Sequence, residues 1–307
     1  MDLPFDSIAA VLESTGNYRV LRRLEQFDDC AEPADEPTFI GLVLDVETTG
    51  IDFASDEAIE LGMLKFEYGA SGRIYRVLDT FNQLHQPSRP IPPEISRLTG
   101  ITDADVAGHR IDDKTVHAIA ADAAVVIAHN ASFDRQMCEP RWPVFREKNW
   151  ACSLNQIPWR AEGHVGTKLG YLLADFSFFH RGHRAVDDCH ALLRLLASPL
   201  RTSEQSAMAA LLATARRPTV RLWATDSPFE TKEILKARSY RWSQRRRSWY
   251  VDLDEAQIEI DRTFLSEEVF GRPVPNISYD QFTARDRFSA RARSRALIGI
   301  ALAMPLA

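Results

Sequence analysis

Two β-strand patterns separated by a short turn constrain the fold more than any other feature of this 307-residue sequence. Residues 58–68 and 73–84 are apolar along much of their length, and the segment 69–72 between them begins and ends with glycine. This pattern predicts an antiparallel hairpin. The apolar run over residues 39–46 lies just before it and predicts a buried strand that can join the hairpin in one sheet.

Strand and helix patterns alternate after the hairpin. Residues 123–128 predict a further buried strand. Helical apolar spacing or helix-forming composition marks the segments 94–98, 114–122, 132–140, 166–176 and 184–196. Several strands followed by such an alternation predict an α/β layered domain with a mixed sheet.

The regions on either side are expected to be smaller units. Residues 1–27 predict two short helices broken at Thr15, Gly16 and Asn17, and residues 219–224, 231–238 and 249–253 predict a strand, a helix and a strand. We therefore expect a helical arm and linker over 1–38, a main domain over 39–200, a helical connection over 201–217, a small basic α+β unit over 218–271 and an Arg-rich tail with little pattern over 272–307.

Charge and composition narrow the functional classes. The net charge of −6 taken alone argues against a nucleic-acid binder. The segment 232–247, however, holds seven Lys or Arg residues against one acid, so positive charge is concentrated there. The four cysteines are widely spaced and include no CxxC pair, which argues against a disulfide framework or a cysteine zinc site and favours a reducing, cytoplasmic location. We find no readable signal peptide and no stretch of the ~20 apolar residues that a membrane span needs.

The motif DVETTG, residues 45–50, follows the first apolar run. Alternate side chains of a strand share a face, so Asp45 and Glu47 point the same way. Two carboxylates on one face repel each other unless a cation lies between them, and hard divalent ions such as Mg²⁺ take carboxylate oxygens. A single Asp-x-Glu motif at a strand end more often marks a solvated edge of the sheet. Its interpretation as a metal site therefore depends on further motifs.

Two later motifs supply candidate partners. HNASFD, residues 129–134, follows the strand over 123–128 and places Asp134 near the start of a helix, where an acid alone would simply favour the helix dipole. HRAVDD, residues 183–188, opens the next predicted helix, and its spacing lets His183 and Asp188 face one cleft. The ordinary alternatives are a satisfied loop histidine and helix-capping acids. Those alternatives hold strongly for three neighbours without a place in the pattern: His180, Asp187 and His190.

The three motifs, in this chain order, resemble those of the DEDDh family of 3′→5′ exonucleases, which includes the proofreading epsilon subunit of bacterial DNA polymerase III. The stretch RPIPPEISRLTGIT, residues 89–102, resembles the family's segment between its first and second motifs. The resemblance covers about residues 39–197. It implies a ribonuclease-H-like fold, with a five-stranded mixed sheet and helices on both sides, and an enzyme that removes nucleotides from a 3′ end.

The resemblance also implies roles for individual residues. The four acids would bind two Mg²⁺ or Mn²⁺ ions, and His183 would be the general base for the attacking water; the acids are Asp45, Glu47, Asp134 and Asp188. Two metals ~3.5–4 Å apart can activate a water and stabilise the leaving oxygen of a phosphodiester. A histidine with an ordinary pKa near 6.5 suits proton acceptance at neutral pH.

Substrate contacts are expected in both parts of the chain. Near the acids they are Thr48, His129, Asn130 and Phe133, although core packing explains Phe133 equally well. In the basic unit they are Arg245, Arg246 and Arg247, which interleave with aromatic residues as in single-strand binding sites. The unit weakly resembles an accessory module of some DNA-processing proteins, and its tryptophans Trp242 and Trp249 are more simply explained as a small core.

The partner is expected to be a nucleic acid with a free 3′ end, and we favour single-stranded DNA in repair or turnover. Three alternatives stay open: a polymerase proofreading subunit with a DNA polymerase or repair partner, an RNA-trimming exoribonuclease, and a non-catalytic nucleic-acid-binding protein. The chain lacks a convincing Gln-x-x-Leu-Pro-Leu-like clamp-binding segment, which argues against the proofreading role. The oligomeric state is not predicted.

Overall fold

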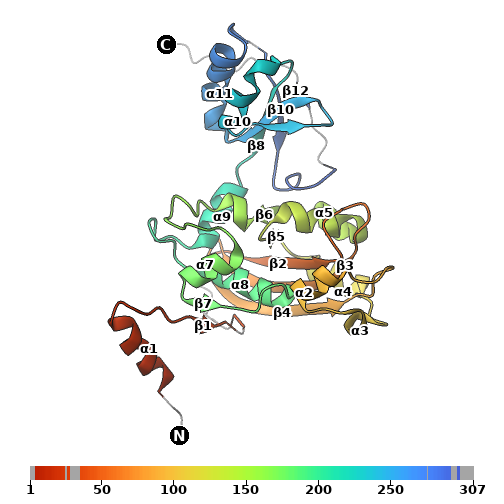
Figure 1. Cartoon of the computed structure of the whole chain (residues 1–307), viewed down its shortest axis with the longest axis vertical. Helices are drawn as coiled ribbons and strands as arrows, with labels where there is room; N and C mark the ends of the chain where they lie inside the picture. The colour runs from red at the N-terminus through yellow and green to blue at the C-terminus, as the bar shows by residue number, and fades with distance from the viewer. Residues whose placement is uncertain (1–3, 25, 28–34, 275, 292–295, 298–307) are drawn as a thin grey trace. The chain divides into compact units, whose positions relative to one another are not determined.

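A computed structural model describes residues 4–24, 26–27, 35–274, 276–291 and 296–297 of the chain. The chain divides into two compact units, Met1–Ala215 and Arg216–Ala307 (Figure 1). The division falls within the connection expected over residues 201–217.

A five-stranded mixed sheet forms the centre of the first unit, in the order β4-β3-β2-β5-β6. Its strands are β2 (Thr38–Thr48), β3 (Ala58–Gly69), β4 (Ile74–Leu84), β5 (Val125–Ala128) and β6 (Trp150–Cys152). Strands β2, β3 and β4 are antiparallel neighbours, whereas β5 is parallel to β2 and β6 is parallel to β5. The expected hairpin and the expected fold class are both confirmed.

Helices cover the sheet on both faces. They are α2 (Pro93–Thr99), α3 (Asp103–Val106), α4 (Asp113–Ala120), α5 (Ala131–Arg141), α6 (Ser153–Gln156), α7 (Leu169–Asp175), α8 (Ala185–Ala197) and α9 (Ala207–Ala215). On one face, Leu64 and Phe66 of β3 share a buried cluster with residues of α8 and α9. On the other face, Ile59 packs against Ile95 of α2 and Val106 of α3. The central strands are therefore buried on both sides, which explains their nearly continuous apolar sequence.

Gly62 permits an unusually close approach between β3 and the start of α8. It lies opposite Asp45 in the β2–β3 ladder, so the two residues share a face of the sheet. A Cβ atom on Gly62 would lie 2.4 Å from the carbonyl carbon of Ala185 and 2.6 Å from the backbone nitrogen of Val186. The first turn of α8 is thus seated directly against the strand next to β2, and only glycine fits between them.

The N-terminal arm differs from the expected pair of helices. The first helix, α1 (Phe5–Ser14), is present, but the second is wrong: the chain forms β1 (Arg22–Arg23), which pairs in parallel with β7 (Phe178–Phe179). The backbone N–H groups of Arg22 and Leu24 donate to carbonyls of residues 177 and 179 at 2.9 and 2.8 Å. These hydrogen bonds to a remote segment replace those that a helix would make. Most of the expected linker, residues 28–34, lies outside the described residues.

The second unit contains an antiparallel sheet in the order β12-β11-β8-β10-β9. Its strands are β8 (Thr219–Ala224), β9 (Arg241–Ser243), β10 (Ser248–Leu253), β11 (Ser278–Phe282) and β12 (Ala296–Leu297), and its helices are α10 (Lys232–Ala237) and α11 (Ile258–Phe264). The expected end of the unit at Gly271 is too early, because β11 pairs with β8 along five residues. Backbone pairing with β8 gives order to part of a tail whose composition suggested no pattern.

Two expectations from composition can be compared with the described residues. Cys138, Cys152 and Cys189 are buried and free, whereas Cys30 lies outside the described part. Among the described helices, none combines the length and the apolar character that crossing a bilayer requires.

Candidate active site

Three carboxylates meet where β2 ends and α8 begins. Asp45 and Glu47 alternate with buried Val46 on β2, and Asp188 lies in the first turn of α8. One oxygen from each of the three carboxylates lies within 4.8 Å of the others. All three residues are half-buried, so this is a concentrated negative site partly removed from solvent.

Asp134 is the fourth expected acid, and it is adjacent to this cluster without being part of it. It lies in the first turn of α5 and is only 4% exposed. The backbone of Val46 hydrogen-bonds to it, which connects the start of α5 to the middle of the Asp45–Glu47 segment. Among the neighbouring charges that act on Asp45, that of Asp134 has the largest effect. The structure therefore brings all four expected acids into one neighbourhood.

Burial and mutual repulsion disfavour ionisation of these carboxyl groups. The pKa of Asp45 is raised well above its ordinary range by burial and then by the charges of Asp134 and Asp188. Burial, followed by the charge of Asp188, raises the pKa of Glu47 to about 8. Burial also raises the pKa of Asp134 to about 7, against the backbone hydrogen bonds that favour its charged form. A cation bound among the four groups would remove the cause of this repulsion.

Asp188 is held by the loop that precedes α8. Its Oδ1 atom lies 2.5 Å from Nε2 of His180, and its Oδ2 atom accepts a hydrogen bond of 2.9 Å from the backbone N–H of His183. His183 is exposed and has a left-handed backbone with φ of 64°. His180 was expected to be an ordinary satisfied histidine outside the motif pattern; it is satisfied, and its partner is the site residue Asp188. His190 is an ordinary buried histidine, as expected, and its Nδ1 atom accepts from the backbone of Phe27.

A buried ion pair fixes the position of the start of α8, and it was not predicted from the sequence. Glu60 lies opposite Glu47 in the β2–β3 ladder and is fully buried. It accepts hydrogen bonds from Nη2 of Arg184 at 2.8 Å and from the backbone N–H of Ala185 at 3.0 Å. The pair Glu60–Arg184 therefore connects β3 to the residues just before Asp188.

The expected substrate residues near the acids have different surroundings. The hydroxyl of buried Thr48 donates to the carbonyl of Gly50. Nε2–H of His129 donates to the carbonyl of Thr167 at 2.9 Å, while its Nδ1 accepts from the hydroxyl of Ser153 at 2.8 Å. Both ring nitrogens are thus engaged within the protein, and burial lowers the pKa of this histidine.

Asn130 and Phe133 lie at the start of α5, beside the acids. Asn130 is exposed, and its side-chain oxygen accepts from the hydroxyl of Ser132. Phe133 pairs with Phe53, with ring centroids 5.8 Å apart. Phe53 belongs to the loop after β2 and is 46% exposed, so Phe133 is part of an aromatic pair open to solvent rather than a core residue. Phe53 was not predicted as a site residue. The available signal in the sequence was its position shortly after DVETTG.

The expected basic contacts of the second unit lie in the turn between β9 and β10. Arg245 and Arg247 are exposed. Arg246 is exposed as well, but it also lies over Trp223, 4.3 Å from the ring centroid, and forms an ion pair with Asp280. Trp242 and Trp249 pair with each other across β9 and β10, but Trp242 remains 44% exposed, so it is only partly a core residue.

Comparisons with known proteins identify the family of the part of the chain that holds this site. A family model described as Exonuclease matches residues 42–196, half of the chain. The PolC-type DNA polymerase III of Thermotoga maritima is 35% identical over 165 residues, which are 50% of this chain and 11% of that protein. The DNA polymerase III subunit epsilon of Treponema pallidum is 28% identical over 165 residues, 49% of this chain and 72% of that protein.

Two exonucleases are among the solved structures that are partly similar to this chain. Exonuclease X in complex with 5′-overhanging duplex DNA is 23% identical with a TM-score of 0.41, covering 55% of this chain and 99% of that one. Exonuclease I of E. coli in complex with a dT13 oligonucleotide is 16% identical with a TM-score of 0.47, covering 60% and 48%. The family match over half of the chain is the decisive result, and it identifies a nuclease hydrolase. The chain belongs to the exonuclease family, in its DEDDh-type 3′→5′ branch.

Proposed function

We propose that the first unit hydrolyses phosphodiester bonds one nucleotide at a time from a 3′ end, by a metal-dependent mechanism. The observation that carries the proposal is the meeting of Asp45, Glu47 and Asp188 within 4.8 Å, beside buried Asp134, in a chain of this family. An arrangement that keeps like charges so close is costly without a ligand, and such perturbed groups concentrate at functional sites.

The residues of the site fit hard divalent cations. The donors are carboxylate oxygens, which Mg²⁺ and Mn²⁺ prefer, and their pKa values are raised by burial and repulsion that a cation would offset. We propose that the four acids hold two such ions. When bound, these ions would lower the pKa of a water and stabilise the charge that develops on the leaving oxygen.

The side chains around the acids have distinct proposed tasks. His183 is the proposed general base, since its backbone N–H donates to Asp188 and the residue is exposed. His180 orients Asp188 through its 2.5 Å contact with Oδ1. The Glu60–Arg184 pair fixes the start of α8, and with it the position of Asp188 relative to β2.

The terminal nucleotide is proposed to lie between the acids and the start of α5. Phe53 and Phe133 offer exposed ring area on which a base can stack. The exposed Asn130 supplies a polar group there, and Thr48, whose buried hydroxyl donates to the carbonyl of Gly50, shapes the neighbouring segment. His129 stabilises the surroundings of the site through its two hydrogen bonds within the protein, and it does not donate to the substrate. Arg245, Arg246 and Arg247 are assigned to more distant parts of the same strand.

Single-stranded DNA in repair or turnover is the substrate and context we propose. The polymerase-associated role is the second candidate, and the observation that favours it is the 35% identity with a region of a PolC-type DNA polymerase. The chain spans only 11% of that relative, so the polymerase's own activities do not transfer to it.

A directional degradation assay tests the proposed function. Wild type and Asp45→Ala are incubated with Mg²⁺ on single-stranded DNA and RNA of one sequence, labelled at the 5′ end in one set and at the 3′ end in another. A ladder that shortens gradually from 5′-labelled strands, with immediate mononucleotide release from 3′-labelled ones, is expected only for wild type without EDTA. Internal cuts, a 5′→3′ ladder, or equal activity of the variant would refute the proposal. The ratio of DNA to RNA rates identifies the substrate class.

A further inference from the structure

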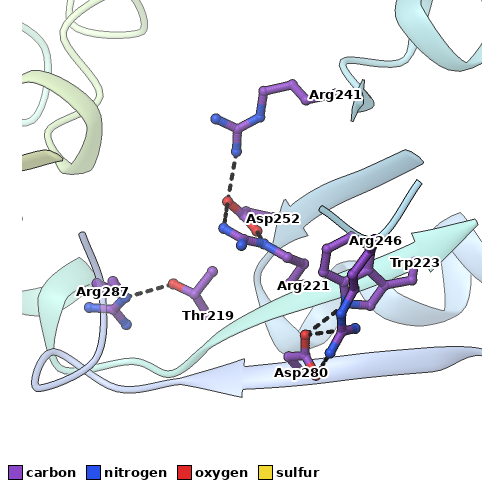
Figure 2. Close-up of polar contacts among 8 residues, drawn as sticks. All are labelled: Thr219, Arg221, Trp223, Arg241, Arg246, Asp252, Asp280 and Arg287. Atoms are coloured by element: carbon purple, nitrogen blue, oxygen red, sulfur yellow. Dashed lines mark hydrogen bonds and ion pairs between the residues drawn. The ribbon is translucent and has the colours of Figure 1, made fainter. Parts of the chain in front are cut away.

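The two faces of the second unit's sheet differ in what lies against them. Leu222 of β8 and Val251 of β10 pack with Leu235 of α10 and with Leu265 in the core of the unit. Side chains alternate along a strand, so the intervening residues point to the opposite face. We call this the arginine face. Its members are Arg221, Trp223, Arg241, Arg246, Tyr250, Asp252 and Asp280, and Figure 2 shows all of them except Tyr250.

Strand register brings these residues together from four strands, except for Arg246, which lies in the β9–β10 turn. Asp252 of β10 and Asp280 of β11 both lie opposite Arg221 of β8. Tyr250 lies opposite Trp223 on one side and opposite Arg241 of β9 on the other. The set is therefore a continuous surface across the sheet. At one end of β8, Arg287 donates to the hydroxyl of Thr219 and covers that end (Figure 2).

The aspartates hold the arginines in fixed positions. Asp252 accepts two hydrogen bonds from Arg221, at 2.6 and 2.9 Å, and one from Arg241 at 2.7 Å. Arg246 forms its ion pair with Asp280 at 3.1 Å. A guanidinium has five N–H donors, so one that already meets a carboxylate keeps donors for a further anion. Arg241 is the most accessible of the three, with a side chain 60% exposed.

Aromatic rings support the same guanidinium groups. Arg221 lies 4.4 Å and Arg241 4.9 Å from the ring centroid of Tyr250. Arg246 lies 4.3 Å from that of Trp223. Cation–π contacts and ion pairs together restrict these long side chains. Because their order is already established, they lose little conformational entropy when they bind an anion.

The charge balance of this surface favours a polyanion. The arginine face and the adjoining β9–β10 turn carry five arginines against two aspartates: Arg221, Arg241, Arg245, Arg246 and Arg247 against Asp252 and Asp280. Asp280 is almost fully buried, so the outward-facing charge is mostly positive. Such a concentration in a chain with a net charge of −6 is complementary to a phosphodiester backbone.

We propose that the arginine face and the β9–β10 turn bind the phosphate backbone of single-stranded nucleic acid, with Arg241 and Arg245 as leading contacts. The identity of the ligand rests on the proposed function, because we propose that the second unit holds the nucleic-acid strand that the first unit shortens. A flexible single strand can follow the width of the sheet, whereas a rigid duplex would present few phosphates to it. Arg246 also orders Trp223 and its edge of the face, through its position over the ring and its ion pair with Asp280.

Binding without turnover tests the proposal. The full chain in EDTA is titrated into fluorescein-labelled oligothymidylate at several salt concentrations, with fluorescence anisotropy as the readout. The double variant Arg241→Gln/Arg245→Gln leaves Asp252 with both hydrogen bonds to Arg221, which favours an intact fold. Arg262→Gln is the matched control, because Arg262 is also an exposed, ion-paired arginine but lies on α11.

The double variant is expected to bind roughly tenfold more weakly, and the slope of log affinity against log salt is expected to fall by about 1.4, for two lost phosphate contacts. The Arg262→Gln control is expected to match wild type. Arg245→Gln alone, in an exposed turn, is a second variant whose fold is not at risk, with a slope change of about 0.7. An unchanged slope in both variants, an equal loss in the control, or equally tight binding of blunt duplex would overturn the proposal.

The outcome can be separated from failure of the proposed function. Cleavage of the p-nitrophenyl ester of thymidine 5′-monophosphate needs the acids of the first unit but offers no extended strand. Wild type is expected to cleave this ester with Mg²⁺ or Mn²⁺ whether or not the arginine face binds the strand. If wild type cleaves nothing with any metal, the proposed function fails, while the anisotropy result still decides the arginine face.

Discussion

Replacing Gly62 by alanine tests whether the close contact between β3 and the start of α8 positions the acids that we propose bind the metal ions. A Cβ on residue 62 would lie 2.4 Å from the carbonyl carbon of Ala185, whereas non-bonded carbon atoms need roughly 3.4 Å or more. The start of α8 must therefore shift by about 1 Å, because backbone atoms on both sides leave no side chain to rotate away. Asp188 lies in that first turn, so its carboxylate would shift with the helix.

The expected loss follows from this displacement. A misplacement of about 1 Å in a catalytic constellation costs on the order of 10²-fold in rate. Overpacking of the interior is expected to lower the free energy of unfolding by about 1–3 kcal/mol. Both quantities are measured on purified protein, as kcat on a short single-stranded oligonucleotide with saturating Mg²⁺ and as urea-induced unfolding.

Gly170→Ala is the matched control, since a Cβ at that helical position meets nothing within 4 Å. It is expected to keep the wild-type kcat and to unfold at a slightly higher urea concentration, because alanine is the better helix former. Wild-type kcat and stability in Gly62→Ala would refute the reasoning. A similar loss in both variants would show that the contact with α8 is not the cause.

Three further predictions concern the same site. Glu60→Gln removes one partner of a buried ion pair and is expected to lower the free energy of unfolding by about 2–3 kcal/mol, allowing for partial exposure of the arginine. Glu259→Gln, in an exposed ion pair with Arg262, should cost under about 1 kcal/mol in the same urea titration. Because the folded-state pKa of Glu47 is raised from 4.5 to about 8, the metal-free protein is expected to lose thermal stability as pH rises between these values. Glu47→Gln should flatten that dependence. A melting temperature that rises with pH in EDTA would contradict the expected direction of the change. In steady-state assays, His183→Ala is expected to lower kcat by about 10²–10⁴-fold. His180→Ala is expected mainly to raise the Mg²⁺ concentration needed for half-maximal rate. The reverse pattern would assign the general base to His180.

Much of the first unit could be predicted because its signals are local. Long apolar runs and a glycine-bearing turn produced the correct β3–β4 hairpin, and the three acidic motifs fall at strand and helix ends where the fold gathers them. The family resemblance depended on the same short motifs, and the family match over residues 42–196 confirms it.

The missed features depend on contacts between distant segments. The two-residue strand at Arg22 exists only through its pairing with residues near 178, and its apolar neighbours fit a helix equally well. Strand β11 likewise depends on β8, so the composition of the tail gave no sign of it. The partner of His180 and the contact of Gly62 with α8 are set by tertiary packing, which spacing along the chain does not encode.

Equilibrium binding of Mn²⁺, followed by the electron paramagnetic resonance signal of the free ion, tests most directly whether the four acids form the metal site of the nuclease. Wild type is expected to bind about two ions, with affinity that rises as pH increases through the raised pKa values of the acids. Asp45→Asn and Asp188→Asn are expected to lose binding and nuclease activity together. Undiminished Mn²⁺ binding in both variants, or degradation of DNA by a wild type that binds no ion, would contradict the assignment.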